Sequence, residues 1–226
     1  MKSKNLFLSY IIFLTSLNII ANDELTIDLG DKNNECKDIT RETLTERNFS
    51  NNFVGTFNGK KIEYTASLKE KIIYEKDDPN LPMASFFYTE YISKDSDQRP
   101  IIFSFNGGPG SASLWLHMGV LGPKVIKVPS DASDDGSPPY NIIDNKLSPL
   151  SDADLVFIYP IGTGYSRASG CHEGEEFWGV SEDPKIIAEF IRRWITDNKR
   201  WNSPRYILGE SYGGIRGPLL VSELRS

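Results

Sequence analysis

The chain has 226 residues, of which 39% are hydrophobic and 25% are charged. This composition is typical of a globular protein and excludes a largely disordered chain, and the length allows one sizeable domain, or a split one. The net charge is −6 and no run of Lys or Arg occurs, so nucleic acid is not an expected partner.

The first 21 residues have the order of charges, apolar core and small residue that is typical of a signal peptide. Lys2 and Lys4 precede an apolar run from Leu6 to Ile20, and Ala21 follows it. A membrane anchor is the alternative, but the run is short and polar residues interrupt it. We therefore expect cleavage near Ala21 and export to the periplasm or the exterior, with no membrane association afterwards.

Residues 22–50 are polar and rich in charge, without a sustained hydrophobic period. We interpret them as a loose extension that precedes a domain over residues 51–226. Cys36 and Cys171 could form one disulfide in an oxidising compartment or remain as two thiols, and the sequence leaves both possibilities open.

The domain begins with a pattern of strands. Residues 53–92 contain alternating stretches rich in aromatic and β-branched side chains, which predicts antiparallel strands. Asn58-Gly59 lies between two of these stretches and predicts a tight hairpin turn. Residues 101–105, IIFSF, are continuously apolar, as in a strand buried on both faces. Residues 131–139 have the composition of a surface loop.

The second half alternates strands and helices. Residues 154–159 and 205–208 predict two more buried strands, and residues 183–198 predict a helix with one broad apolar face. Asp183 is the expected cap of this helix, with Pro184 at its first position. Apolar strands that alternate with a helix are typical of a parallel sheet covered by helices.

Residues 209–213, Gly-Glu-Ser-Tyr-Gly, match the pattern G-x-S-x-G between a predicted strand and a helix. In a turn directly from strand to helix, the middle residue is strained and its neighbours two positions away are crowded. Glycine at 209 and 213 relieves that crowding and leaves the Ser211 hydroxyl exposed above the sheet. The alternative is a glycine-rich turn with an ordinary serine.

Residues 106–110, Asn-Gly-Gly-Pro-Gly, directly follow the IIFSF strand. In hydrolases of this architecture, a glycine-rich loop at this place supplies one backbone N–H of the oxyanion hole, and the residue after the nucleophile supplies the other. A plain tight turn is the alternative. No G-K-[ST] follows, and 162–164 lacks the third glycine of a dinucleotide fingerprint, so neither segment predicts a nucleotide site. No cofactor and no metal are expected.

Three stretches together resemble the serine carboxypeptidases, the family of carboxypeptidase Y and cathepsin A, and look closest to its bacterial branch. They are FSFNGGPGSASLWLHMGVLGP, DLVFIYPIGTGYSRA and RWNSPRYILGESYGG. The resemblance covers most of residues 55–220. It implies an α/β-hydrolase fold, with a mostly parallel sheet and helices on both faces, truncated after the turn that holds Ser211.

The resemblance also implies a role for six residues: Ser211 as nucleophile, Gly108 and Tyr212 as oxyanion donors, and Asn106, Gly107 and Glu210 as the site for the peptide's terminal carboxylate. Glu210 can bond that carboxylate only when it is itself protonated, because two negative charges in one site repel each other. Binding is therefore expected to be best in acid. Without the surrounding motif, Glu210 would be interpreted as a surface or ion-paired residue.

Four positions depart from the pattern of the family and could alter the recognition pocket. Val120 stands where many relatives carry a second glutamate, so the pair of carboxyl groups that would share a proton is absent here. Ser111 replaces a frequent cysteine, Ser104 a common tryptophan, and Tyr159 an Asp or Asn. None of them touches the nucleophile.

In this family an Asp and then a His follow the serine, yet no Asp and no His follow Ser211 here. We expect His117 to be a structural histidine and His172 to be a solvated loop residue. The prediction is the N-terminal portion of an exported carboxypeptidase, which removes C-terminal residues from peptides through an acyl-enzyme on Ser211 and is inactive as these 226 residues. The alternatives are an esterase or acyltransferase on the same scaffold, and a non-catalytic remnant or binding protein.

Overall fold

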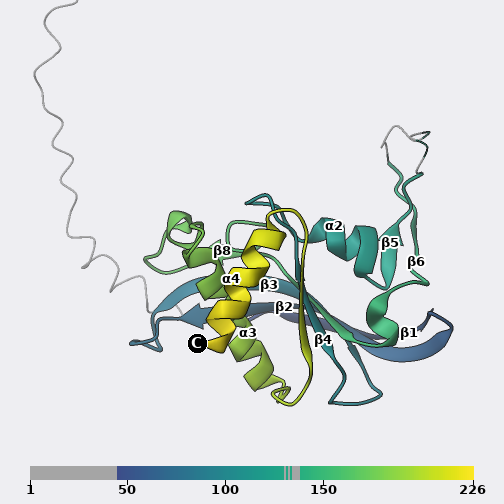
Figure 1. Cartoon of the computed structure of the whole chain (residues 1–226), viewed down its shortest axis with the longest axis horizontal. Helices are drawn as coiled ribbons and strands as arrows, with labels where there is room; N and C mark the ends of the chain where they lie inside the picture. Colours follow the sequence, from purple (N-terminus) through teal and green to yellow (C-terminus); the bar gives the residue numbers. More distant parts are fainter. Residues whose placement is uncertain (1–44, 130, 132, 134–137) are drawn as a thin grey trace, which may run out of the picture. The chain divides into compact units, whose positions relative to one another are not determined.

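The computed structural model describes residues 45–129, 131, 133 and 138–226, and Figure 1 shows how their helices and strands are arranged. The predicted signal peptide and residues 22–44 of the predicted extension lie outside these residues. Within the described ranges, no helix has both the length and the apolar character needed to span a membrane.

Three long antiparallel strands form one side of the sheet, namely β1 (Asn48–Phe57), β2 (Lys60–Tyr74) and β3 (Pro82–Ser93). The predicted hairpin turn is confirmed: Asn58 and Gly59 connect β1 to β2 with φ of 48° and 78°, the positive values that a tight hairpin requires. The first strand begins at Asn48 rather than after residue 50, because β2 is long enough to pair with these residues too.

The other side of the sheet is parallel. β4 (Ile101–Phe105) lies between β7 (Asp154–Ile158) and β9 (Arg205–Gly209) and is parallel to both. β7 in turn pairs antiparallel with β3, which gives the order β1-β2-β3-β7-β4-β9, with the short β8 (Arg167–Ala168) also on β3. The parallel sheet that the sequence predicts for these three strands is therefore confirmed, and the ends of β4 and β9 meet at one edge.

Helices cover both faces of the sheet. α3 (Glu182–Asp197) and α4 (Gly213–Arg225) lie side by side over one face, where the predicted apolar face of α3 is buried against β3 and β4. The other face packs on a second cluster that includes Leu116 of α2 (Leu114–Leu116). This is the arrangement of an α/β-hydrolase domain, as the sequence predicts.

The remaining elements are short: the π-helical η1 (His117–Leu121), the 3-10 helices η2 (Pro149–Ser151) and η3 (Gly174–Phe177), and the two-stranded sheet of β5 (Lys124–Ile126) and β6 (Ile142–Asp144). The predicted loop at 131–139 connects β5 to β6, and most of it lies outside the described residues.

Asp183 is not the cap of α3, contrary to the prediction. The helix begins one residue earlier, at Glu182, with Ser181 in front of it. Asp183 lies inside the first turn, and its carboxylate accepts a hydrogen bond from Arg216 of α4 at 2.6 Å. The Asp183 carboxylate forms an ion pair with Arg216 and therefore does not cap the helix.

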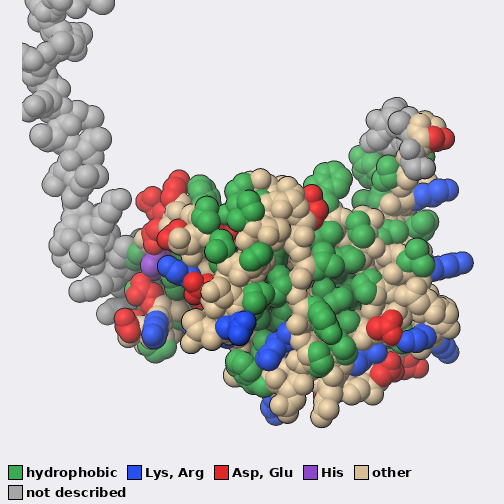
Figure 2. Space-filling model, in the orientation of Figure 1, with side chains coloured by type: hydrophobic (Ala, Val, Ile, Leu, Met, Phe, Trp, Pro, Cys, Tyr) green, Lys and Arg blue, Asp and Glu red, His purple; other side chains and the backbone are tan. Residues whose placement is uncertain are grey.

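The prediction that residues 205–208 form a buried strand is also wrong. β9 is the last strand of the described sheet, so Arg205 and Tyr206 are exposed and Tyr206 keeps 58% of its accessible surface. Figure 2, which looks onto β9 and α4, shows hydrophobic side chains gathered on this face. A strand with an apolar sequence is buried only where another element covers it.

Ser104, in the middle of β4, is 1% exposed, and its Oγ is the only fully buried side-chain polar atom in the described part of the chain without a hydrogen-bond partner. An unpaired buried hydroxyl costs free energy. We therefore expect Ser104→Ala to leave the free energy of unfolding unchanged or to raise it by about 1 kcal/mol, as measured by urea denaturation.

Ser166 is the matched control for this prediction, because it is equally buried but accepts from Phe87 N at 2.8 Å and donates to Tyr159 O at 2.7 Å. Ser166→Ala is expected to lower the free energy of unfolding by about 1–3 kcal/mol. A clear loss of stability in Ser104→Ala would show that this hydroxyl has a partner, such as a buried water.

Candidate active site

The turn between β9 and α4 has the strained geometry that the G-x-S-x-G pattern predicts. Ser211 has a φ of 58°, in the left-handed region that a serine rarely adopts. A Cβ on Gly209 would lie only 2.3 Å from the carbonyl oxygen of Gly213, and one on Gly213 would lie 3.3 Å from the carbonyl oxygen of Phe105. The two glycines therefore permit the turn, and the serine at its tip is exposed.

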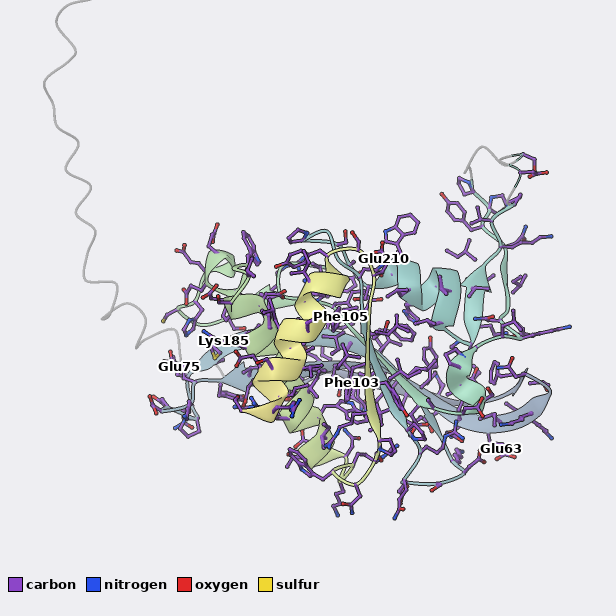
Figure 3. All side chains as sticks on the ribbon, in the orientation of Figure 1. Glu63, Glu75, Phe103, Phe105, Lys185 and Glu210 are labelled. Atoms are coloured by element: carbon purple, nitrogen blue, oxygen red, sulfur yellow. The ribbon has the colours of Figure 1, made fainter. Side chains whose placement is uncertain are left out.

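The loop of residues 106–110 lies directly against this turn, as predicted. Phe105 pairs with Gly209 at the ends of β4 and β9, and Glu210 N donates to Phe105 O at 3.3 Å. A Cβ on Gly107 would lie 2.4 Å from Tyr212 N, so only glycine allows this approach. Gly108 has a φ of 105°, which also favours glycine. Figure 3 shows Glu210 beyond Phe105, past the ends of these strands.

Asn106 and Glu210 connect the loop to the turn through their side chains. Asn106 is fully buried; its Oδ1 accepts from Leu116 N at 3.0 Å, and its Nδ2 donates to Glu210 Oε2 at 3.1 Å. Because Leu116 N can only donate, it orients the Asn106 amide with its NH₂ group toward Glu210. Glu210 itself is exposed, so its carboxyl group is accessible to a ligand.

Comparison with known proteins supports the family resemblance that the sequence shows. A family model described as "Serine carboxypeptidase" matches residues 68–226. The chain belongs to the serine carboxypeptidase family. Within its described part, the loop of residues 106–110 and the serine turn lie together at the ends of β4 and β9.

Similar curated proteins include serine carboxypeptidase-like 9 of Arabidopsis thaliana, which is 28% identical over 141 residues. Serine carboxypeptidase-like 13 of the same plant is 29% identical over 143 residues. Each match covers 62% of this chain and 31% of the relative. The chain thus spans about a third of the length of these serine carboxypeptidase relatives.

His117, one of the two histidines of this family member, is structural, as predicted. It is buried and stacked on Phe157, with Nε2 2.6 Å from Tyr91 Oη and Nδ1 3.3 Å from Tyr159 Oη. Burial lowers its pKa to about 4, so the ring is neutral near pH 7. Both ring nitrogens are bonded to phenols, and among the described contacts neither bonds Ser211. Tyr159, one of the departures from the family, therefore holds this histidine.

His172 is not a solvated loop residue, contrary to the prediction. Its Nδ1 lies 2.7 Å from Glu176 Oε2 and its Nε2 lies 2.8 Å from Glu75 Oε1, and its side chain is only 17% exposed. Burial lowers the pKa of His172, but the bonds with Glu176 and Glu75 outweigh burial and raise it overall. The adjacent Cys171 is disulfide-bonded; Cys36, the only other cysteine, lies outside the described residues.

The raised pKa of His172 predicts a pH-dependent stability. A histidine whose pKa is higher in the folded chain stabilises it below the unfolded pKa of about 6.5, and this stabilisation disappears as pH rises through the folded pKa. The free energy of unfolding of wild type should therefore exceed that of His172→Gln at about pH 5.5, and the difference should shrink toward about pH 9.

His117→Phe is a control of opposite sign, because burial lowers the pKa of His117 to about 4 in the folded chain, below its unfolded value of about 6.5. As pH falls from about 9 to about 5.5, the free energy of unfolding of wild type should therefore fall by about 1 kcal/mol relative to that of His117→Phe, the opposite of the change expected relative to His172→Gln. A difference between wild type and His172→Gln that does not change with pH would contradict the charged bridge to Glu75 and Glu176.

Sequence reasoning missed Arg216, which lies one turn into α4. Its Nη1 donates to the backbone oxygen of Asn106 at 2.7 Å, in addition to its bond with Asp183. A signal was present: Gly213, Arg216 and Leu220 recur at helical spacing, and these are the buried residues of α4. A charged residue on the buried face of a helix needs a partner close to it.

Proposed function

We propose that this chain carries the nucleophile and the substrate-binding residues of a serine carboxypeptidase, which releases C-terminal residues from peptides through an acyl-enzyme on Ser211. The observation that supports the proposal most strongly is the contact between two separate motifs. The strained Ser211 turn lies against the glycine loop, and the bond from Asn106 to Glu210 links them.

In this proposal, Ser211 Oγ attacks the carbonyl carbon of the scissile peptide bond. The negative charge that develops on the carbonyl oxygen is stabilised by the backbone N–H groups of Gly108 and Tyr212. The N–H of Tyr212 lies at the start of α4, where the helix dipole also favours negative charge. The proton of the Ser211 hydroxyl must pass to a base, and no bond to such a base is found among the described residues.

The substrate in this proposal is a peptide with a free terminal carboxylate, bound by Asn106, Gly107 and Glu210. Asn106 offers its amide, Gly107 offers a backbone N–H, and a protonated Glu210 donates its carboxyl proton to the ligand. An ionised Glu210 would instead repel the ligand's carboxylate. We also propose export to the periplasm or the exterior. This part of the proposal depends on the sequence of residues 1–21 alone, since they lie outside the described residues.

The test is a titration of the 226-residue chain with an N-blocked dipeptide that ends in a free carboxylate, and with its C-terminal amide, monitored by calorimetry. The acid should bind at least about tenfold more tightly than the amide near pH 5. This preference should decline as pH rises. In Glu210→Gln the decline should disappear, because a carboxamide donates at every pH.

Glu63→Gln is the matched control, because Glu63 is an exposed glutamate of β2, and Figure 3 shows it far from Glu210. It should retain the pH dependence of wild type. Equal binding of acid and amide would overturn the assignment of a carboxylate site and favour an esterase or acyltransferase on the same scaffold.

A further inference from the structure

The guanidinium group of Arg216 connects the candidate site to the helix layer beneath it. Arg216 is 2% exposed. It donates from Nη1 to Asn106 O at 2.7 Å and from Nε to Asp183 Oδ2 at 2.6 Å. The group also lies over two rings, 5.1 Å from the centroid of Phe105 and 5.3 Å from that of Tyr212. It thus contacts β4, the loop after β4, the serine turn and the first turn of α3.

The bond to Asn106 constrains the part of the loop that approaches the serine turn. The carbonyl of Asn106 belongs to the same planar peptide unit as the N–H of Gly107. Gly107 lies so close to Tyr212 N that a Cβ there would come within 2.4 Å of it. A tilt of this peptide plane would therefore move both the Asn106 side chain and the loop's contact with Tyr212.

We propose that Arg216 is a positioning residue, which holds the loop of residues 106–110 in register with the Ser211 turn. Asp183 holds the guanidinium in place, and the guanidinium holds the Asn106–Gly107 peptide. This inference rests on the proposed function, because it assigns Arg216 an effect on carboxylate binding and on the oxyanion donors. Arg216 itself does not contact the substrate.

The location of the pair supports this role. A cavity of about 320 Å³ lies beside the loop, and both Asp183 and Arg216 line it together with Pro109 and Gly110 of the loop. The loop is therefore not packed tightly against the protein on this side. A specific bond from Arg216 replaces the packing that would otherwise set its position.

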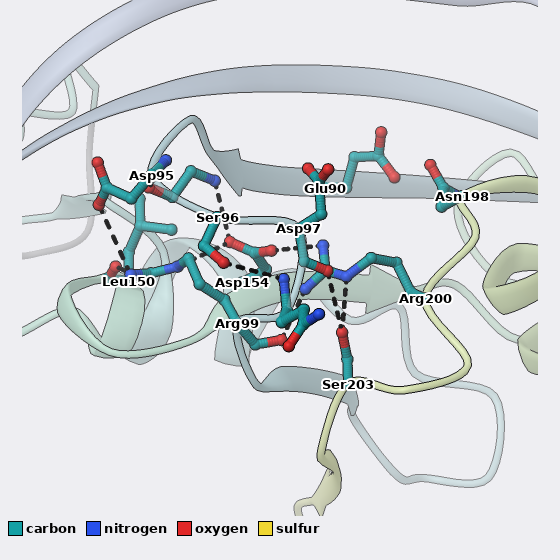
Figure 4. A network of polar contacts seen from close by, with 12 residues as sticks. Glu90, Asp95, Ser96, Asp97, Arg99, Leu150, Asp154, Asn198, Arg200 and Ser203 are labelled. Carbon is teal, nitrogen blue, oxygen red and sulfur yellow. Dashed lines mark hydrogen bonds and ion pairs between the residues drawn. The ribbon is translucent and has the colours of Figure 1, made fainter.

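Arg200 provides a matched control within the same chain. It is 5% exposed, and like Arg216 it bonds a carboxylate and a backbone carbonyl: Asp154 Oδ2 at 2.8 Å and Arg99 O at 2.7 Å. It also donates from Nε to Ser203 Oγ at 2.8 Å. Figure 4 shows this network. Arg99 precedes β4 and Asn106 follows it, so the two arginines act at opposite ends of one strand.

The experiment compares the 226-residue wild type with Arg216→Met, Arg216→Lys and Arg200→Met, each confirmed as folded by circular dichroism. Calorimetry gives the affinity for the dipeptide acid and amide. Hydrogen exchange gives the opening of the Ser111, Leu116 and Glu210 amides, which are bonded to Gly107 O, Asn106 Oδ1 and Phe105 O.

Arg216→Met should lose at least about tenfold in affinity for the acid and should exchange these amides at least about tenfold faster than Arg200→Met. Arg200→Met should bind the acid within about twofold of wild type, although its stability falls as well. Arg216→Lys keeps a positive charge opposite Asp183 but loses the fork that bonds two acceptors, so its affinity should lie between those of Arg216→Met and wild type. Arg216→Lys also keeps the test available if Arg216→Met does not fold.

Two results separate this inference from the proposed function. If wild type prefers the acid but the Arg216 variants bind as wild type does, the positioning role is wrong and the proposed function stands. If wild type shows no preference, the proposed function fails, and hydrogen exchange alone decides whether Arg216 holds the loop. Equal exchange in Arg216→Met and Arg200→Met would overturn the inference in either case.

Discussion

Asp154→Ala is expected to lower the free energy of unfolding by about 3–5 kcal/mol, because it leaves a buried arginine without its counter-charge. Asp154, the first residue of β7, is fully buried. Its Oδ2 accepts from Arg200 Nη1 at 2.8 Å, and its Oδ1 accepts from Ser93 N at 2.9 Å and Arg99 Nε at 3.3 Å. The carboxylate therefore connects β3, β7 and the segments before β4 and β9 (Figure 4). Urea denaturation measures the loss.

Asp152→Ala is the control for this prediction. Asp152 lies two residues earlier and also forms an ion pair, with Lys60 Nζ at 2.5 Å, but both side chains are exposed. Solvent screens such a pair, so the free energy of unfolding should fall by less than about 1 kcal/mol. Similar losses in both variants would show that the Asp154 network stabilises the fold no more than a surface pair does.

Ser211 of the 226-residue chain is expected to react with an organophosphate at least about 10⁴-fold more slowly than the serine of a complete serine carboxypeptidase assayed in parallel. A serine hydroxyl stays protonated and is a poor nucleophile without an adjacent base. His117 is held between two phenols and His172 between two glutamates, so neither is free to act as that base. Mass spectrometry of the labelled peptide measures the labelling rate. Hydrolysis of a blocked dipeptide by the same chain should be undetectable.

Ser211→Ala is the control for any slow background labelling elsewhere in the chain. Rapid labelling of Ser211 would contradict the prediction and would mean that a base reaches the hydroxyl. Loss of that reaction in His117→Phe or in His172→Gln would then identify which histidine moves to supply it.

Much of the fold follows from local patterns that the tertiary structure did not override. The segments 101–105 and 154–158 are strands because they are rich in β-branched and aromatic side chains. Asn58-Gly59 turns the chain because both residues tolerate positive φ. The glycines around Ser211 predicted a strained turn for the same local reason. The Ser211 turn contacts the loop at 106–110 because β4 and β9, which precede them, are parallel neighbours.

Other features depended on which residues the fold brings together. The sequence by itself placed His172 in a loop, but only the structure brings Glu75, 97 residues away, to its Nε2. Residues 205–208 are apolar enough for a buried strand, yet β9 is the last strand of the described sheet, so Arg205 and Tyr206 are exposed while Ile207 and Leu208 are half-buried.

The largest difference between sequence and structure concerns Asp183 and Arg216. The sequence pattern around Asp183 predicted a helix cap, and the pattern around Arg216 predicted no role. In the structure Arg216 bonds Asp183, 33 residues away, and Asn106, 110 residues away. Local rules describe a residue's preference within its own turn or strand. A buried charge, however, must find its partner wherever packing places one, because leaving it unpaired in a low dielectric costs more than the local preference is worth.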